Sequence, residues 1–130
     1  MTTTIAWEAT VEWDHRLTGY ANLGPKTHWA LVKKAKDHDK DATRAAWRDA
    51  GRPTPPGPVL LRFTRIAPRA FDDDDNLRDA FKFVKDEICR CIGYPNDAHP
   101  NLRFEFAQRR GAVRQYTVRI EMFAEVRRGR

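Results

Sequence analysis

The sequence predicts a small α+β domain in which two helices cover a mixed β-sheet. Four segments alternate apolar and polar residues, two longer segments read as helices, and their order is β-α-β-α-β-β. The chain has 130 residues, close to the usual size of one compact domain. We therefore expect residues 1–130 to form a single domain.

The first strand and first helix are predicted in the N-terminal part of the chain. After the strand and a loop with Gly and Pro, residues 27–50 contain no helix breaker. This long surface helix should end at Gly51 and the Pro-rich run 52–58. The apolar positions of the strand are Ile5, Trp7, Ala9, Val11 and Trp13, and those of the helix are Leu31, Ala35, Ala42, Ala45 and Ala46.

The C-terminal part predicts one more helix and three strands. The second strand covers Val59 to Thr64 and leads into a cluster of acidic residues. The second helix should run from about Asp75 to Ile92 and stop at Gly93. The last two strands are centred on residues 102–106 and 116–122, and the basic link 108–114 between them predicts a hairpin loop.

Composition narrows the class of partner. A formal net charge of +6 favours a polyanion such as nucleic acid. No apolar run approaches the length of a membrane span, and the N-terminus lacks a signal-peptide pattern, so we expect a cytoplasmic protein without a membrane partner. Cys89 and Cys91 would lie about 200° apart on a helix, which predicts two reduced thiols.

The most informative segment is Asp72-Asp73-Asp74-Asp75-Asn76-Leu77. Four adjacent carboxylates repel one another, so a bound cation is a natural explanation for the cluster. A calcium loop of the EF-hand type is excluded, because the required Gly and Glu positions are missing. Helix capping is an alternative, but it accounts for one Asp and not for four.

A second stripe of the predicted helix continues the acidic pattern. Asp75, Asp79, Lys82 and Asp86 recur at helical spacing, about 160° from the apolar stripe. The alternative is an ordinary solvated face in which Asp79 and Lys82 form a weak pair. Asp97, in the turn after the helix, would complete a metal site if it returned to this face. Otherwise it is a common turn former.

These residues resemble the RusA family of phage-type Holliday junction resolvases. Three segments match the family pattern, together with Gly93, and the similarity spans roughly residues 20–123. Two positions depart from the family pattern. Asp79 stands where the family has Lys, so Lys82 can match that Lys if this helix is three residues longer than in the family. Asn96 replaces the first Asp of the usual pair. The matching segments are Asp73-Asp74-Asp75-Asn76-Leu77, Lys82-Phe83-Val84-Lys85-Asp86 and Asn96-Asp97.

The resemblance implies a homodimeric endonuclease that resolves four-way DNA in recombination and repair, encoded by a phage or prophage. It uses Mg²⁺, with Mn²⁺ as a possible substitute, and no organic cofactor. Asp73, Asp75 and Asp97 would bind the metal ion, and Lys82 would stabilise the charge of the transition state. Asp86 would orient Lys82 through an i,i+4 ion pair or support a metal ligand, and Asn76 and Asp79 would also support the site. DNA would be bound by Asn22, Lys26, Lys33, Lys34, Arg109, Arg110 and Arg114.

Three alternatives remain open at the level of sequence. The first is a nuclease of the same kind that cuts flaps or forks instead of four-way junctions. The second is a catalytically silent DNA-binding module that keeps the fold and has lost catalysis through the changes at Asp79 and Asn96. The third is a phage accessory protein whose acidic face binds a host protein.

Overall fold

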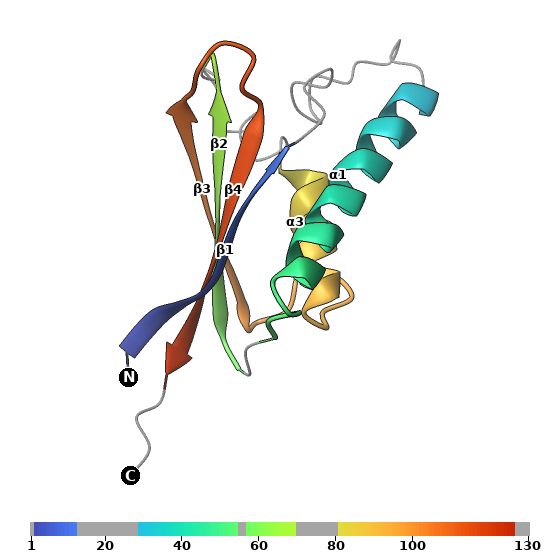
Figure 1. Cartoon of the computed structure of the whole chain (residues 1–130). Helices are drawn as coiled ribbons and strands as arrows, with labels where there is room; N and C mark the ends of the chain where they lie inside the picture. Colours follow the sequence, from blue (N-terminus) through green and yellow to red (C-terminus); the bar gives the residue numbers. More distant parts are fainter. Residues whose placement is uncertain (1, 13–28, 55–56, 70–80, 127–130) are drawn as a thin grey trace.

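The computed structural model describes residues 2–12, 29–54, 57–69 and 81–126. Both helices of this part lie on the same side of a four-stranded sheet (Figure 1), which confirms the α+β class and the mixed sheet. No helix of the described residues is long and apolar enough to cross a membrane. The elements are β1 (Thr2–Glu12), α1 (Trp29–Asp49), β2 (Val59–Ala67), α3 (Lys82–Cys91), β3 (Leu102–Arg110) and β4 (Thr117–Val126).

The strand order is β1-β4-β2-β3, so the predicted hairpin between the last two strands is wrong. Strand β2 lies between β3 and β4, parallel to β3 and antiparallel to β4. The connection from β2 to β3 contains α3, and a helical crossover is what joins neighbouring parallel strands. The link after β3 therefore passes the end of β2, where Gly111 N–H donates a hydrogen bond to Ala67 O at 2.8 Å.

Strand β1 forms the edge next to β4 and contains an irregularity. Ile5 is opposite Phe123 and Trp7 is opposite Met122, so Ala6 is an extra residue in the ladder. The strict alternation predicted from Ile5 onward is thus interrupted before Trp7. The last residue of the predicted strand, Trp13, lies outside the described residues.

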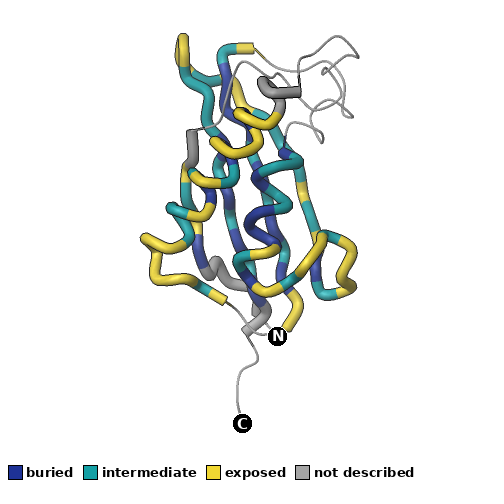
Figure 2. The backbone as a smooth tube through the Cα atoms, turned by 90° about the vertical axis from the view of Figure 1, so that its right-hand side faces the viewer, coloured by how far each residue is buried: buried dark blue, intermediate teal, exposed yellow. Residues whose placement is uncertain are grey.

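The core lies between the helices and the inner face of the sheet. The tube in Figure 2 shows the buried residues concentrated along the strands and α3, with exposed residues at the connections. Strand β2 is the most buried strand, as expected for a central position. The largest fully buried side chains include Phe63, Leu61, Ile120 and Met122 from the sheet, and Phe81, Val84 and Ile88 from the α3 segment.

Both helices end as the sequence predicts, at a glycine. Gly51 has φ +89° and Gly93 has φ +100°, a left-handed conformation that glycine adopts without a steric penalty. After α3, Tyr94 N–H donates to Cys89 O and Gly93 N–H donates to Arg90 O, the pair of bonds of a Schellman motif. This cap turns the chain sharply at the end of α3 and directs residues 94–101 back along the sheet.

Helix α1 is held against α3 by small residues and one ion pair. The buried Ala35 and the partly buried Ala42 and Ala46 belong to the predicted stripe of α1. Arg44 Nε donates to Glu87 Oε2 at 3.0 Å. The Glu87 side chain is only 6% exposed, whereas that of Arg44 is 50% exposed.

Arg44→Ala is expected to destabilise the protein by about 1–3 kcal/mol, because it leaves a buried carboxylate without its counterion. The double variant Arg44→Leu/Glu87→Leu should recover most of that loss, since an apolar pair needs no counterion. Chemical denaturation measures the free energy of unfolding, with Arg48→Ala on the same helix as the control. Equal stabilities of Arg44→Ala and Arg48→Ala would contradict this role of the pair.

Candidate active site on α3

The start of α3 is fixed by a cluster of aromatic rings. Phe81, directly before the helix, is fully buried, and its ring centroid lies 5.7 Å from that of Phe63 and 5.5 Å from that of Phe106. Such spacings are typical of favourable aromatic packing. Because Phe81 packs against rings of β2 and β3, the start of α3, and with it the backbone of Lys82, is positioned on the sheet.

Three charged residues follow one another on the outward side of α3. At about 100° per residue, Lys82 lies between Lys85 and Asp86, and the three span an arc of about 100°. Lys82 Nζ is 3.5 Å from Asp86 Oδ2, so the i,i+4 ion pair expected from the sequence is present. The Lys82 side chain is 44% exposed.

Asp97 returns from the turn after α3 and contacts the same helix. Its Oδ2 atom is 2.8 Å from Lys85 Nζ. The Lys85 ammonium also lies 5.3 Å from the ring centroid of Phe104 and 5.9 Å from that of Phe106, within cation–π range. The loop carboxylate and the charged face of α3, which are separate in the sequence, are therefore neighbours in the fold.

The turn that carries Asp97 is built by its own polar groups. Asn96 Oδ1 accepts a hydrogen bond from Ala98 N–H at 2.9 Å, which is an Asx turn around Asp97. An Asp side chain makes the same turn, so Asn96 preserves the local geometry at the position where the RusA pattern has Asp. His99 Nδ1 accepts from Asn101 N–H at 3.0 Å, and Tyr94 packs against His99 with ring centroids 4.6 Å apart.

Electrostatics keep Asp97 charged and the nearby thiols neutral. The hydrogen-bonded ammonium of Lys85 lowers the pKa of Asp97 below its ordinary value, with Lys82 contributing in the same direction. Burial, reinforced by Asp97, raises the pKa of Cys89 to about 12, and burial raises that of Cys91 to about 11. Both cysteines are free, as predicted, and at neutral pH neither is a thiolate nucleophile.

The Lys85–Asp97 pair predicts a specific acid response. A carboxyl whose pKa is lower in the folded state stabilises the protein above its unfolded pKa, and this contribution is lost as the pH falls through the folded pKa. In metal-free buffer, wild type should therefore be more stable than Asp97→Asn at neutral pH, and the difference should vanish on acidification. Denaturation between about pH 2 and pH 7 measures it. A stability difference between wild type and Asp97→Asn that does not change with pH would contradict the assignment, and so would an equal pH-dependent difference between wild type and Asp49→Asn.

Several predicted site residues lie outside the described residues: Asn22, Lys26, Asp73, Asp75, Asn76 and Asp79. The first part of the predicted second helix lies there as well. Within residues 2–12, 29–54, 57–69 and 81–126, no three His, Cys, Asp or Glu side chains are grouped so that they could hold a metal ion. The structure thus brings together Lys82, Asp86 and Asp97 of the predicted set.

Lys85 was not predicted as a site residue, although it is the group in direct contact with Asp97. A signal was available, because Lys85 follows Lys82 by three residues and so shares its helix face. The contact itself joins two elements, and no local pattern indicates it.

The predicted DNA-binding cations differ in how far their charge is compensated. Lys33 on α1 forms an ion pair with Asp37 at 2.9 Å. The next residue, Lys34, is also exposed but forms no ion pair with another described residue. Arg109, Arg110 and Arg114, at the link from β3 to β4, are all exposed, and no carboxylate of the described residues forms an ion pair with them. The three arginines therefore retain their positive charge for an external anion.

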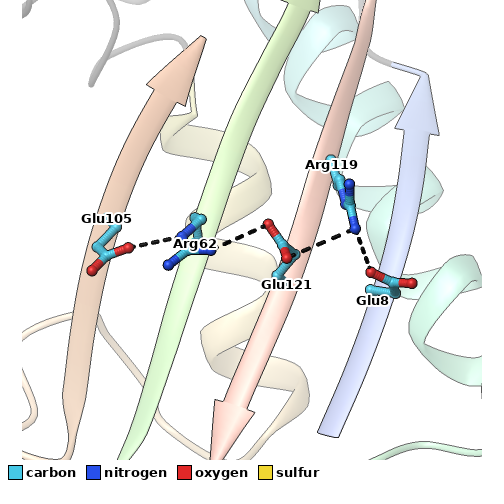
Figure 3. Close-up of polar contacts among 5 residues, drawn as sticks. All are labelled: Glu8, Arg62, Glu105, Arg119 and Glu121. Carbon is cyan, nitrogen blue, oxygen red and sulfur yellow. Dashed lines mark hydrogen bonds and ion pairs between the residues drawn. The ribbon is translucent and has the colours of Figure 1, made fainter. Parts of the chain in front are cut away.

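The sheet face away from the helices has the opposite character. Figure 3 shows a row of alternating charges across the four strands: Glu105, Arg62, Glu121, Arg119 and Glu8. Arg62 pairs with Glu105 at 2.8 Å, and Arg119 pairs with Glu8 at 2.6 Å. With three carboxylates against two guanidinium groups, this row offers no excess positive charge. A polyanion is better accommodated at the β3–β4 link than on the open sheet.

Comparison with known proteins finds no matching family model and no curated protein of significant sequence similarity.

Proposed function

We propose that this protein is a Mg²⁺-dependent endonuclease that cuts branched DNA, in the manner implied by its resemblance to the RusA family. One observation supports the proposal most strongly. The turn after α3 brings the ionised Asp97 to the helix face that carries Lys82 and Asp86. A carboxylate bonded to Lys85, with the partly exposed Lys82 on the same helix face, is an arrangement suited to phosphodiester chemistry, and the turn after α3 creates it.

The residues fit a hard divalent cation. Asp97 carries an ionised carboxylate of the kind that Mg²⁺ prefers; its side chain is 41% exposed, and Lys85 is bonded to Oδ2. Asp73 and Asp75 would provide the other carboxylates, with Asn76 and Asp79 beside them in the sequence. When bound, Mg²⁺ or Mn²⁺ would polarise the scissile phosphodiester and lower the pKa of a bound water.

The side chains of α3 have separate roles in this proposal. Lys82 stabilises the negative charge that develops on the phosphate, because it carries a positive charge on a partly exposed side chain of this helix face. Asp86 positions Lys82 through their ion pair. Lys85 holds the Asp97 carboxylate in place and keeps it ionised before the metal ion binds.

The DNA is bound through its phosphates by the uncompensated cations Lys34, Arg109, Arg110 and Arg114, with further contacts from Asn22, Lys26 and Lys33. Phosphate contacts of this kind do not depend on base sequence and weaken with salt. A four-way junction has near two-fold symmetry, so a homodimer with two equivalent sites suits paired cleavage.

A second function is favoured by one observation and is kept as the alternative. The Lys85 ammonium occupies the Asp97 carboxylate at 2.8 Å and supplies the positive charge that a metal ion would otherwise provide. If this internal cation is not displaced, the protein is a DNA-binding module without catalysis.

Metal-linked thermal stability separates the two functions. A ligand that binds only the folded state stabilises it by about 1.4 kcal/mol at ten times its dissociation constant. Wild type should therefore gain several degrees in melting temperature with millimolar Mg²⁺ or Ca²⁺. Asp97→Asn should lose this gain, and Asp49→Asn, an exposed position at the end of α1, should keep it.

The alternative has its own signature in the same experiment. If Lys85 permanently replaces the metal ion, wild type shows no gain, and Lys85→Gln acquires one because the carboxylates are then uncompensated. A gain that is equal in wild type and Asp97→Asn would remove Asp97 from the metal site.

A further inference from the structure

The link between β3 and β4 presents an apolar side chain at its tip. Val113 is 84% exposed and is the only exposed large hydrophobic residue among those described. A single exposed apolar side chain is common on protein surfaces. The residues near Val113 are less usual, because three exposed arginines, Arg109, Arg110 and Arg114, lie within four residues of it in the sequence.

Two hydrogen bonds between Ala112 and Gln115 close the turn that carries Val113. Gln115 N–H donates to Ala112 O at 3.1 Å, and Ala112 N–H donates to the side-chain Oε1 of Gln115 at 2.9 Å. Arg114 has φ +64°, a left-handed conformation that non-glycine residues seldom adopt. These bonds define the turn that presents Val113, which reduces the ordering cost when a partner binds.

The base of the link is packed against the end of β2. A Cβ atom at Gly111 would lie 2.8 Å from Ile66 Cγ2 and 2.7 Å from Gln115 Oε1, too close for any other residue without movement. Gly111 N–H is also bonded to Ala67 O. Ala67 ends β2, and the acidic cluster begins five residues later in the sequence, at Asp72. The tip is thus fixed to the strand that leads into the proposed metal site.

We propose that Val113 is an apolar wedge that packs against the exposed base pair at a branch point of DNA, while Arg109, Arg110 and Arg114 bind the flanking phosphates. This inference rests on the proposed function only in taking DNA as the ligand. The exposed arginines favour a polyanion, and the apolar tip needs a surface that is not charged. Both are found together where a base-pair stack faces the solvent between phosphate backbones.

The size of Val113 indicates where the wedge acts. Burial of one Val side chain contributes less than the separation of an intact stacked step costs. At a branch point the stack is already interrupted, so this cost is absent. The wedge therefore favours branched DNA over continuous duplex and does not select a base sequence.

Equilibrium binding in EDTA tests the wedge without cleavage. A synthetic four-way junction and a linear duplex of equal length are compared for wild type, Val113→Thr and Val113→Ile. Thr has the same shape as Val and keeps the backbone preference, but its hydroxyl disfavours an apolar contact. Val113→Thr should lower the preference for the junction about tenfold, with duplex affinity unchanged. Val113→Ile should retain or increase the preference.

Two further measurements make the result specific. A 2-aminopurine base at the branch point should change its fluorescence on binding of wild type and not of Val113→Thr. Replacing Arg109, Arg110 and Arg114 by Ala should weaken junction and duplex binding alike, and reduce the slope of log K against log salt by up to about 0.9 per lost contact. An unchanged junction preference in Val113→Thr, or no measurable DNA binding by wild type, would overturn the wedge.

The wedge and the nuclease can fail separately. Binding that depends on Val113 without any cleavage in Mg²⁺ would refute the proposed nuclease and leave the wedge standing. Normal cleavage by Val113→Thr with an unchanged junction preference would refute the wedge and leave the nuclease standing.

Discussion

The Asp75→Asn variant is expected to lose Mg²⁺-dependent cleavage of four-way DNA completely while it stays folded. An amide is a neutral and weaker ligand than a carboxylate, and Mg²⁺ requires hard anionic oxygen atoms. Folding should be unaffected or slightly improved, because one of four adjacent carboxylates is neutralised. The measurement is a single-turnover cleavage assay together with a denaturation curve.

Two further variants make the result for Asp75 interpretable. Asp97→Asn should abolish cleavage as well. It should also remove the loss of stability at acidic pH that the Lys85–Asp97 pair causes, whereas Asp75→Asn should leave that loss in place. Asp49→Asn should cleave like wild type. Cleavage at the wild-type rate by Asp75→Asn would refute the metal-site assignment.

Lys82→Ala is expected to slow the chemical step on the order of 10²-fold or more, with almost unchanged affinity for DNA. Lys82 is a partly exposed lysine on this face of α3, and one phosphate contact among many contributes little to binding. Lys85→Ala should instead raise the pKa of Asp97 and strengthen metal binding, because it removes the cation that is bonded to the carboxylate. The rate and the metal dependence, measured separately, distinguish the two lysines.

Position 79 provides a test of the sequence alignment behind this assignment. Asp79→Lys in the Lys82→Ala background should fail to restore activity, because the new lysine is almost one turn closer to the acidic cluster. Normal cleavage by Lys82→Ala would show that Lys82 is not the catalytic lysine. Activation of an inactive wild type by Asp79→Lys would favour the silent DNA-binding module.

Local signals in the sequence predicted the elements well. Gly51 and Gly93 were predicted as helix ends, and both have the positive φ that makes glycine the preferred residue there. The helix predicted at 27–50 is α1, Trp29–Asp49, within two residues at each end. Such features depend on residues close in sequence, so periodicity and turn chemistry are sufficient to find them.

Pairing between distant segments was predicted less well. The link 108–114 has the composition of a hairpin loop, yet β2 lies between β3 and β4. Nothing within the link indicates this, because the competing partner is a strand more than 40 residues earlier in the chain. The presence of a helix between the second and third strands was the available signal, since it favours a parallel pair.

In the candidate site, too, the local contact was predicted and the contact between separate elements was not. The i,i+4 pair of Lys82 and Asp86 follows from helix geometry and was expected. The contact of Lys85 with Asp97 depends on the packing of the turn against α3 and on the rings of Phe104 and Phe106. Residue identity alone could not show which lysine meets the carboxylate.

Cleavage of a synthetic four-way junction in Mg²⁺ and in EDTA tests the central proposal most directly. Flap, fork and linear duplex substrates of equal length serve as comparisons. The proposed function predicts paired nicks near the branch point in Mg²⁺, none in EDTA, and little cleavage of the linear duplex. No Mg²⁺-dependent cleavage of any branched substrate by the folded protein would contradict it.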